Sequence, residues 1–399
     1  MAGGGGGNGW IKQLVAGSVL IAAGMVLHAA HIGPAGVSAG LLGVGGLLVV
    51  FGSCGSLIKA VDGLAKRAKL NDFVAGTLAG LASNVPELVM LGFVLATEPR
   101  LGFVVTTLTL HVGAASFGLY CALLPRDESG HSALPEPLVK ITTDLFACAA
   151  GVFFATGSVM VLVNVFKTGA HAGESLGIAD LCVLGVALLA VQVVATLALI
   201  RRFSGDAAMS EPKNGATDAA TAADAPTVDP STPSVPVIAG YLLVGLGASV
   251  LGGHAVGDFA DVLVAGLRAA GWSEMVGALV LSVFASAGAF AMVFTAHRRG
   301  LYDVALANAS GQVSQVPFVV LPVSMLLLAC FGATGVVPLT PSGGVLPIDL
   351  ETTSVLLLSF PSMLILWKAI KDDGKVNGLE TVAMLSLFGV TIYFLAAHG

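Results

Sequence analysis

Charged side chains are scarce in this chain of 399 residues. Asp, Glu, Lys and Arg make up 11%, hydrophobic residues make up 56%, and the mean hydropathy is +0.92. This composition excludes an ordinary soluble domain and predicts a polytopic membrane protein whose surroundings are a lipid bilayer. Cysteine is rare too, and all five cysteines fall in apolar stretches, so no disulfide framework is expected. No P-loop, His-Glu-x-x-His or Cys-x-x-Cys motif is present, and nothing points to a cofactor or to nucleic acid.

The apolar stretches have the length that crosses the hydrocarbon core of a bilayer, about 20 residues. We expect membrane helices at 11–29, 36–58, 73–96, 101–124, 139–165, 176–200, 236–266, 275–296, 302–332, 351–370 and 377–397. The predicted fold class is therefore an all-α polytopic membrane protein with about 11 transmembrane helices.

Lys and Arg are distributed unevenly between the loops of this topology. With a cytoplasmic N-terminus, all but three of the 18 basic residues lie on the cytoplasmic side, and only Arg100, Lys167 and Arg268 lie outside. Basic residues mark the cytoplasmic loops of membrane proteins. The sequence therefore predicts a cytoplasmic N-terminus and, with an odd number of spans, a C-terminus on the outer side.

Residues 203–235 break the apolar pattern, because they are acidic, rich in Ala, Thr and Pro, and almost free of large apolar side chains. We expect a disordered cytoplasmic linker there. The linker separates five predicted helices in 36–202 from five in 236–399, while 1–35 hold an N-terminal tail and a leading helix. Because five crossings are an odd number, the second unit should be an inverted repeat of the first, and such repeats place their binding site at the membrane midplane between them.

Glu87 lies near the middle of the third apolar stretch, where a charged side chain costs about 2.5 kcal/mol or more. Ser83 and Asn84 precede it, and Pro86 lacks the N–H that would pair with the carbonyl of Ala82. These groups would gather several oxygen atoms at the midplane, as a hard cation requires. We predict a cation-binding site here; the alternative is a protonated carboxyl that only ties helices together.

The second half contributes only neutral groups to this predicted site. A shift of 202 residues carries Asn84 onto Ser286 and Glu87 onto Ala289, and a dense series of polar residues follows in 302–332. The predicted neutral ligands from this half are Ser286, Asn308 and Gln315. The alternative for the polar series is hydrogen bonding between helices.

Two segments resemble the calcium/cation antiporter superfamily, and within it the cation/proton exchanger branch. Ser83-Asn-Val-Pro-Glu87 is similar to the Gly-Asn-x-x-Glu motif of the first repeat. Asp303-Val-Ala-Leu-Ala-Asn308, continued by Gly311-Gln-Val-Ser-Gln315 and Phe318-Val-Val-Leu-Pro322, is similar to the helix that carries Asp-Ile-Ala-Leu and Gly-Ser-x-Thr-Gln in the family.

The resemblance implies a secondary antiporter that exchanges Ca²⁺ or another inorganic cation for H⁺ by alternating access, with Glu87 binding each in turn. The chain departs from the family at Ala289, where the second repeat would carry its own carboxylate. One half of a two-glutamate calcium site is therefore missing. Exchange of Na⁺ or another monovalent cation for H⁺ is the alternative, and a pseudo-transporter that binds a cation without moving it is a third possibility.

Two further groups of ionisable residues lie in predicted spans. His111 stands in an otherwise apolar helix, where it is either a packing residue or a proton carrier, since histidine titrates at about pH 6.5. His254, Asp258 and Asp261 follow one another at i, i+4 and i+7 and so share a helix face. That spacing suits a role in ion access, and solvated charges at the end of a span are the alternative.

Gly36-Val-Ser38-Ala-Gly40 matches the Gly-x-Ser-x-Gly pattern of serine hydrolases, which makes an intramembrane hydrolase the rival from another functional class. That chemistry needs a general base beside the serine and a strand before it. Ser38 lies at an expected helix start, where small residues favour helix packing. We predict a transporter and not an enzyme.

Overall fold

The computed structural model describes residues 9–32, 34–68, 72–124, 132–133, 136–166, 175–206, 233–298 and 302–398. Most of the predicted linker, residues 207–232, lies outside these ranges, as does Lys167.

The described residues form helices that follow the predicted spans closely. Their bounds are α1 Gly9–Ala29, α2 Ala35–Arg67, α3 Asp72–Thr97, α4 Pro99–Leu123, α5 Glu136–Phe166, α6 Ile178–Asp206, α7 Val235–Ala269, α8 Glu274–Arg298, α9 Tyr302–Gln315, α10 Leu321–Thr334, α11 Leu350–Asp373 and α12 Gly378–His398. A π-helical segment, η1 (Val316–Val320), joins α9 to α10 within one span. Among the described residues, eleven helical segments are long and apolar enough to cross a membrane, which confirms the predicted fold class.

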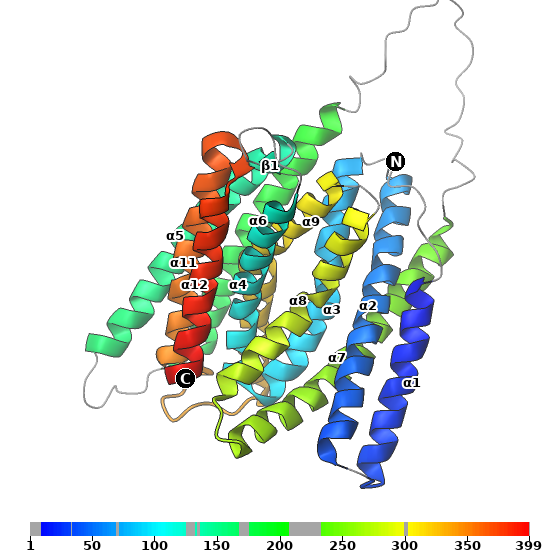
Figure 1. Ribbon diagram of the computed structural model, residues 1–399, viewed down its shortest axis with the longest axis vertical. Coiled ribbons are helices and arrows are strands. Elements are labelled where there is room, and N and C mark those ends of the chain that lie inside the picture. Colours follow the sequence, from blue (N-terminus) through cyan, green and yellow to red (C-terminus); the bar gives the residue numbers. More distant parts are fainter. Residues whose placement is uncertain are drawn as a thin grey trace, which may run out of the picture.

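The helices form one bundle in which α3, α4, α8 and α9 lie between two outer groups (Figure 1). At one edge, α1 packs on α2 and α2 packs on α7; at the other, α11 packs on α5 and α12. The central helix α4 is buried along most of its length and carries Phe103 and Phe117 in the core. The residues of α4 are therefore largely shielded from the surroundings of the bundle.

The packing of α2 against α7 depends on glycine. A Cβ atom on Gly46 would lie 2.8 Å from the carbonyl oxygen of Gly252, and one on Gly252 would lie 2.9 Å from that of Gly46. Between lipid tails, small residues let helix backbones approach and gain van der Waals contact. Ser53 of α2 adds a hydrogen bond of 2.8 Å to the carbonyl oxygen of Gly245. Glycine therefore sets the close approach of these two helices.

The ends of these helices agree with the shift of 202 residues. The shift carries Arg67, the last residue of α2, onto Ala269, the last residue of α7. It also carries Asp72, the first residue of α3, onto Glu274, the first residue of α8. Two copies of one helical pattern would give such agreement, and it supports the alignment of Glu87 with Ala289.

Two short strand pairs connect loops from different halves of the chain. β1 (Ser132–Ala133), before α5, pairs antiparallel with β4 (Lys375–Val376), before α12. β2 (Ser175–Leu176), before α6, pairs antiparallel with β3 (Leu346–Pro347), before α11. Each pair thus joins the loop before the fourth helix of one predicted repeat to the loop before the fifth helix of the other. Two inverted repeats related by a two-fold axis would pair their loops in this crossed manner.

Ion pairs tie together three loops at one end of the bundle. Arg100, at the start of α4, contacts Glu274 through Nη1 at 2.9 Å, Asp349 through Nε at 2.6 Å and Glu351 through Nη2 at 2.6 Å. Burial raises the pKa of Asp349, whereas the N–H of Thr352 and the charge of Arg100 act in the opposite direction.

Arg268 extends this group, which we call the Arg100 cluster: Glu98, Arg100, Arg268, Glu274, Asp349 and Glu351. Its guanidinium contacts Glu274 and lies 3.8 Å from Glu98. Arg100 and Arg268 are two of the three basic residues that the topology assigns to the outer side. Their carboxylate partners explain why these charges lie there, although most basic residues lie on the predicted cytoplasmic side.

Candidate functional site

Glu87 lies at a break in α3. Pro86 is inside this helix, so the carbonyl of Ala82 lacks its ordinary N–H partner. The Glu87 side chain is buried, with 8% of the residue exposed, and its Oε1 atom has no hydrogen-bond partner. A buried carboxylate oxygen without a donor is costly unless a proton or a cation occupies it. Pro86 therefore removes the ordinary helical partner of the Ala82 carbonyl about one turn before a buried acid whose Oε1 has no hydrogen-bond partner.

An amide bridge connects this break to the second half of the chain. The Nδ2 atom of Asn84 donates to Oε1 of Gln315 at 2.7 Å, and both side chains are buried. Gln315 is the last residue of α9, and the π-helical segment with Pro317 follows at once. Both helices that carry the bridge are therefore irregular near it: α3 contains Pro86, and α9 ends at a π-helical segment. Such π-helical turns are frequent at functional sites.

Cys54 of α2 lies between α3 and α8. The thiol of Cys54 donates to the carbonyl oxygen of Ser83 at 3.6 Å, and a Cβ atom on Gly288 would lie 3.4 Å from the same sulfur. Two residues earlier, Ser286 is completely buried and its Oγ has no partner. Sequence alone assigned Cys54 to packing, but the structure places it between the two aligned segments.

The remaining polar residues of α9 also face inward. Gln312 is buried and its Nε2 has no partner, and a Cβ atom on Gly113 of α4 would lie 3.6 Å from its Cδ. Asn308 is half-buried two turns before Gln315. The structure thus joins Asn84 to Gln315 directly, on the helix that also carries Ser83 and Glu87. Ser286 and Asn308 lie on α8 and α9, which both contact α3.

The surroundings of Glu87 are electrically neutral. Among the described residues, no charged side chain acts on its carboxylate, and the contacts around it come from amide, hydroxyl, thiol and carbonyl groups. No arginine or lysine therefore neutralises the acid, which leaves that role to a bound cation or a proton.

His111 bonds to α11. Its Nε2 lies 3.1 Å from both the carbonyl oxygen of Val355 and the hydroxyl of Ser359, while its Nδ1 is buried without a partner. Both hydrogen bonds of the ring join α4 to α11, and neither involves α3, the helix of Glu87. These contacts suit the packing role, and a part in proton transfer stays a prediction.

His254, Asp258 and Asp261 lie on an exposed face of α7 near the end of α3. Nδ1 of His254 is 3.9 Å from Asp258, and the hydroxyl of Thr97 donates to Asp261 at 3.4 Å. Within the described ranges, no three His, Cys, Asp or Glu side chains come close enough to hold a metal ion. The spacing along α7 therefore yields an exposed acidic face near α3, and its role in ion access stays a prediction.

Ser38 donates to the carbonyl oxygen of Ala35 at 2.9 Å, in the first turn of α2. The residue before that helix, Pro34, has extended backbone but belongs to no described strand. This is the helix-packing arrangement and lacks the strand that a nucleophile elbow requires.

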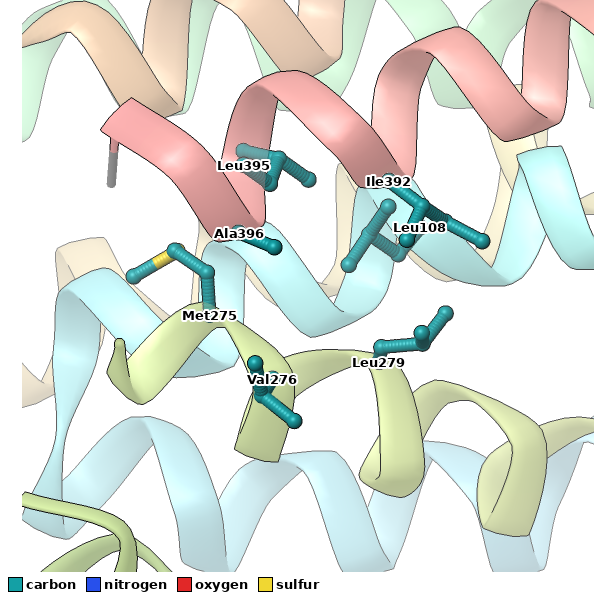
Figure 2. Close-up of a pocket in the computed structure, with 7 residues that line it drawn as sticks. All are labelled: Leu108, Met275, Val276, Leu279, Ile392, Leu395 and Ala396. Carbon is teal, nitrogen blue, oxygen red and sulfur yellow. The ribbon is translucent and has the colours of Figure 1, made fainter. Parts of the chain in front are cut away.

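One pocket lies between α4, α8 and α12 and has an entirely apolar lining (Figure 2). Its side chains are Leu108, Met275, Val276, Leu279, Ile392, Leu395 and Ala396. A hard cation requires oxygen ligands, and these side chains offer none. The cation site is therefore to be sought at the Glu87 break and not in this pocket.

Comparison with known proteins supports the family resemblance. Residues 237–397 match the family described as sodium/calcium exchanger protein. Curated proteins give no match to the chain.

Three solved structures share the fold. The H⁺/Ca²⁺ exchanger CAX aligns over 97% of this chain and 91% of its own, with 13% identity and a TM-score of 0.60. The Ca²⁺/H⁺ antiporter protein YfkE aligns over 97% and 99%, with 14% identity and a TM-score of 0.60. The sodium-calcium exchanger NCX_Mj aligns over 90% and 97%, with 15% identity and a TM-score of 0.51. Residues 237–397 of this chain are therefore similar in sequence to the sodium/calcium exchanger family, and almost the whole chain shares the fold of these cation exchangers.

Proposed function

We propose that this multi-pass membrane protein exchanges an inorganic cation for H⁺ by alternating access, and that Glu87 is the group that binds each of them in turn. The similarity of residues 237–397 to the sodium/calcium exchanger family supports a cation antiporter. The observation that carries the proposal is the buried Glu87 carboxylate, whose Oε1 has no partner and whose described surroundings contain no positive side chain.

Such a carboxylate has two favourable loaded forms. In a low-dielectric interior the free ionised acid is disfavoured, whereas the protonated acid and the cation-bound acid are both tolerated. If the transporter switches between its inward-open and outward-open conformations only when Glu87 is loaded, a cation carried in one direction must be followed by a proton carried in the other. Competition at one group then couples the two fluxes without any further device.

Neutral oxygens complete the proposed coordination. Asn84 and the free carbonyl of Ala82 come from α3, and Ser286, Asn308 and Gln315 come from α8 and α9. Gln315 Oε1 accepts from Asn84 in this structure. Gln315 can therefore bind a cation only if its hydrogen bond to Asn84 opens or rotates. Because this bond joins α3 to α9, cation binding would be coupled to the relative position of the two halves.

Ca²⁺ is the cation that the family resemblance implies, and the similar structures are those of the H⁺/Ca²⁺ exchanger CAX and the Ca²⁺/H⁺ antiporter protein YfkE. Ala289, in place of a second acid, favours Na⁺ or another monovalent cation as the second candidate.

Flux measurements in proteoliposomes test this proposal. The purified protein is reconstituted with an imposed pH gradient, and Ca²⁺, Mn²⁺, Na⁺ and K⁺ are added separately while a pH-sensitive dye reports the lumen. At least one cation is expected to dissipate the gradient. Cation binding without any flux would identify a pseudo-transporter, and neither binding nor flux would leave the hydrolase as the rival.

A further inference from the structure

The charge of the site determines the class of cation that it can carry. We infer that the Glu87 site takes a monovalent cation and exchanges one such ion for one proton, so that no net charge crosses the membrane. This inference rests on the proposed function, because it specifies the ion that the same site transports.

The first observation is that Glu87 has no acidic partner. In the second half, the aligned position is Ala289, and a Cβ atom on its neighbour Gly288 would lie 3.4 Å from the sulfur of Cys54. A carboxylate at the aligned position of α8 is therefore absent, and the described neighbours of Glu87 are neutral.

The other acids of the site-bearing helices are all at helix ends. Asp72 and Glu274 are the first residues of α3 and α8, and Asp303 is the second residue of α9. With a rise of about 1.5 Å per residue, these positions lie about 18 to 22 Å along their helices from Glu87, Ser286 and Gln315. Their positions exclude them from a shared site.

The acidic face of α7 is also distant from Glu87. Asp261 meets Thr97, which is ten residues beyond Glu87 and thus about 15 Å along α3. Asp258 and Asp261 are partly or fully exposed. They can attract cations at the end of the bundle, but they do not add charge to the buried site.

The charge balance follows from these positions. A single carboxylate with a monovalent cation is neutral, and the same carboxylate with a proton is neutral. With a divalent cation the site carries one uncompensated positive charge, and a charge in the hydrocarbon region costs about 2.5 kcal/mol or more. Only a monovalent cation therefore gives two loaded forms of equal charge that can both cross.

The supply of oxygens agrees with this assignment. Ca²⁺ takes about six to eight oxygen ligands, with carboxylates prominent among them. Here one carboxylate is available, and Gln315 Oε1 is already engaged by Asn84. A monovalent cation, which needs fewer oxygen ligands and less negative charge than Ca²⁺, fits this site better.

The coupling ratio is measured in proteoliposomes with the membrane potential clamped by K⁺ and valinomycin, and the same clamp without Na⁺ serves as the blank. A tenfold Na⁺ gradient is expected to support a pH gradient of about one unit at every clamped potential. A pH gradient that shifts by about one unit for each 60 mV would show that net charge moves, and it would overturn the inference.

A second arm changes the charge of the site. Ala289→Glu is expected to raise the rate with Ca²⁺ relative to Na⁺ by at least about tenfold. Ala289→Gln adds the same bulk without charge and should leave the ratio near that of the wild type. An unchanged ratio in a folded Ala289→Glu protein would contradict the charge argument.

The outcomes separate the two proposals. Ca²⁺/H⁺ exchange by the wild type at a rate equal to or above that with Na⁺ would overturn the monovalent assignment while leaving antiport at Glu87 intact. Absence of flux with every cation would overturn both.

Discussion

The Arg100 cluster makes a quantitative prediction for the variant Arg100→Gln. The guanidinium contacts three carboxylates at 2.6 to 2.9 Å, and its side chain is 34% exposed. Well-formed hydrogen bonds between charged groups contribute about 1.5 to 3 kcal/mol, whereas exposed ion pairs contribute about 0 to 1 kcal/mol. The contribution of the partly exposed Arg100 should lie between these two ranges. We expect the free energy of unfolding to fall by about 2 kcal/mol, since Glu274, Asp349 and Glu351 would then repel one another.

Thermal unfolding of the detergent-purified protein, followed by tryptophan fluorescence, measures this loss. A decrease of about 2 kcal/mol corresponds to an apparent Tm lower by about 2 °C in a chain of this size. Lys368→Gln is the matched control, because it removes one positive charge from a pair with Asp372 in which Lys368 is 67% exposed. Because water screens this exposed pair, the control variant should unfold at a Tm close to that of the wild type. An Arg100→Gln protein no less stable than Lys368→Gln would refute the view that the cluster holds the three loops together.

Three further predictions concern the interior of the bundle. Alanine substitution of Asn84 and Gln315, singly and together, should give a coupling energy of about 0.6 to 1.7 kcal/mol in a thermal-stability double-mutant cycle, because each removes the same hydrogen bond; additive effects would contradict the bridge. Gly46→Val should strongly reduce folded yield in detergent, whereas Gly247→Val, with open space around it, should not; equal yields would contradict the close crossing of α2 and α7. His111→Asn should lower Tm and leave the pH profile of exchange unchanged, because the ring bonds to α11; a shifted profile would show that the histidine carries protons.

The fold was largely predictable because lipid imposes simple rules. Every helix must span about the same thickness, so that the apolar stretches reveal their number, and the basic residues reveal their order across the membrane. The helix ends of α2 and α7 then agree with the repeat offset found in the sequence. The strand pairs β1–β4 and β2–β3 were not predictable, since two-residue strands carry no periodic signal.

The site was predictable in part. A carboxylate beside a proline in an apolar stretch marks the break in α3, and the polar series marks α9, because polar groups are rare and costly at such depth. The partner of each side chain was not predictable: the Asn84–Gln315 bond joins positions far apart in sequence and depends on how α3 meets α9. Sequence also missed the place of Cys54 and the ion pairs of Arg100, because a small thiol and a single arginine have no pattern of their own.

Cation-driven proton flux in the Glu87→Gln variant tests the central claim most directly. The amide keeps the shape of the side chain but cannot exchange a proton, so flux should disappear in proteoliposomes while the purified protein keeps its Tm within a few degrees. Asp144→Asn, which removes an acid at an exposed position of α5, is the matched control and should transport at the wild-type rate. Flux at the wild-type rate in Glu87→Gln would contradict the account and remove Glu87 from the mechanism.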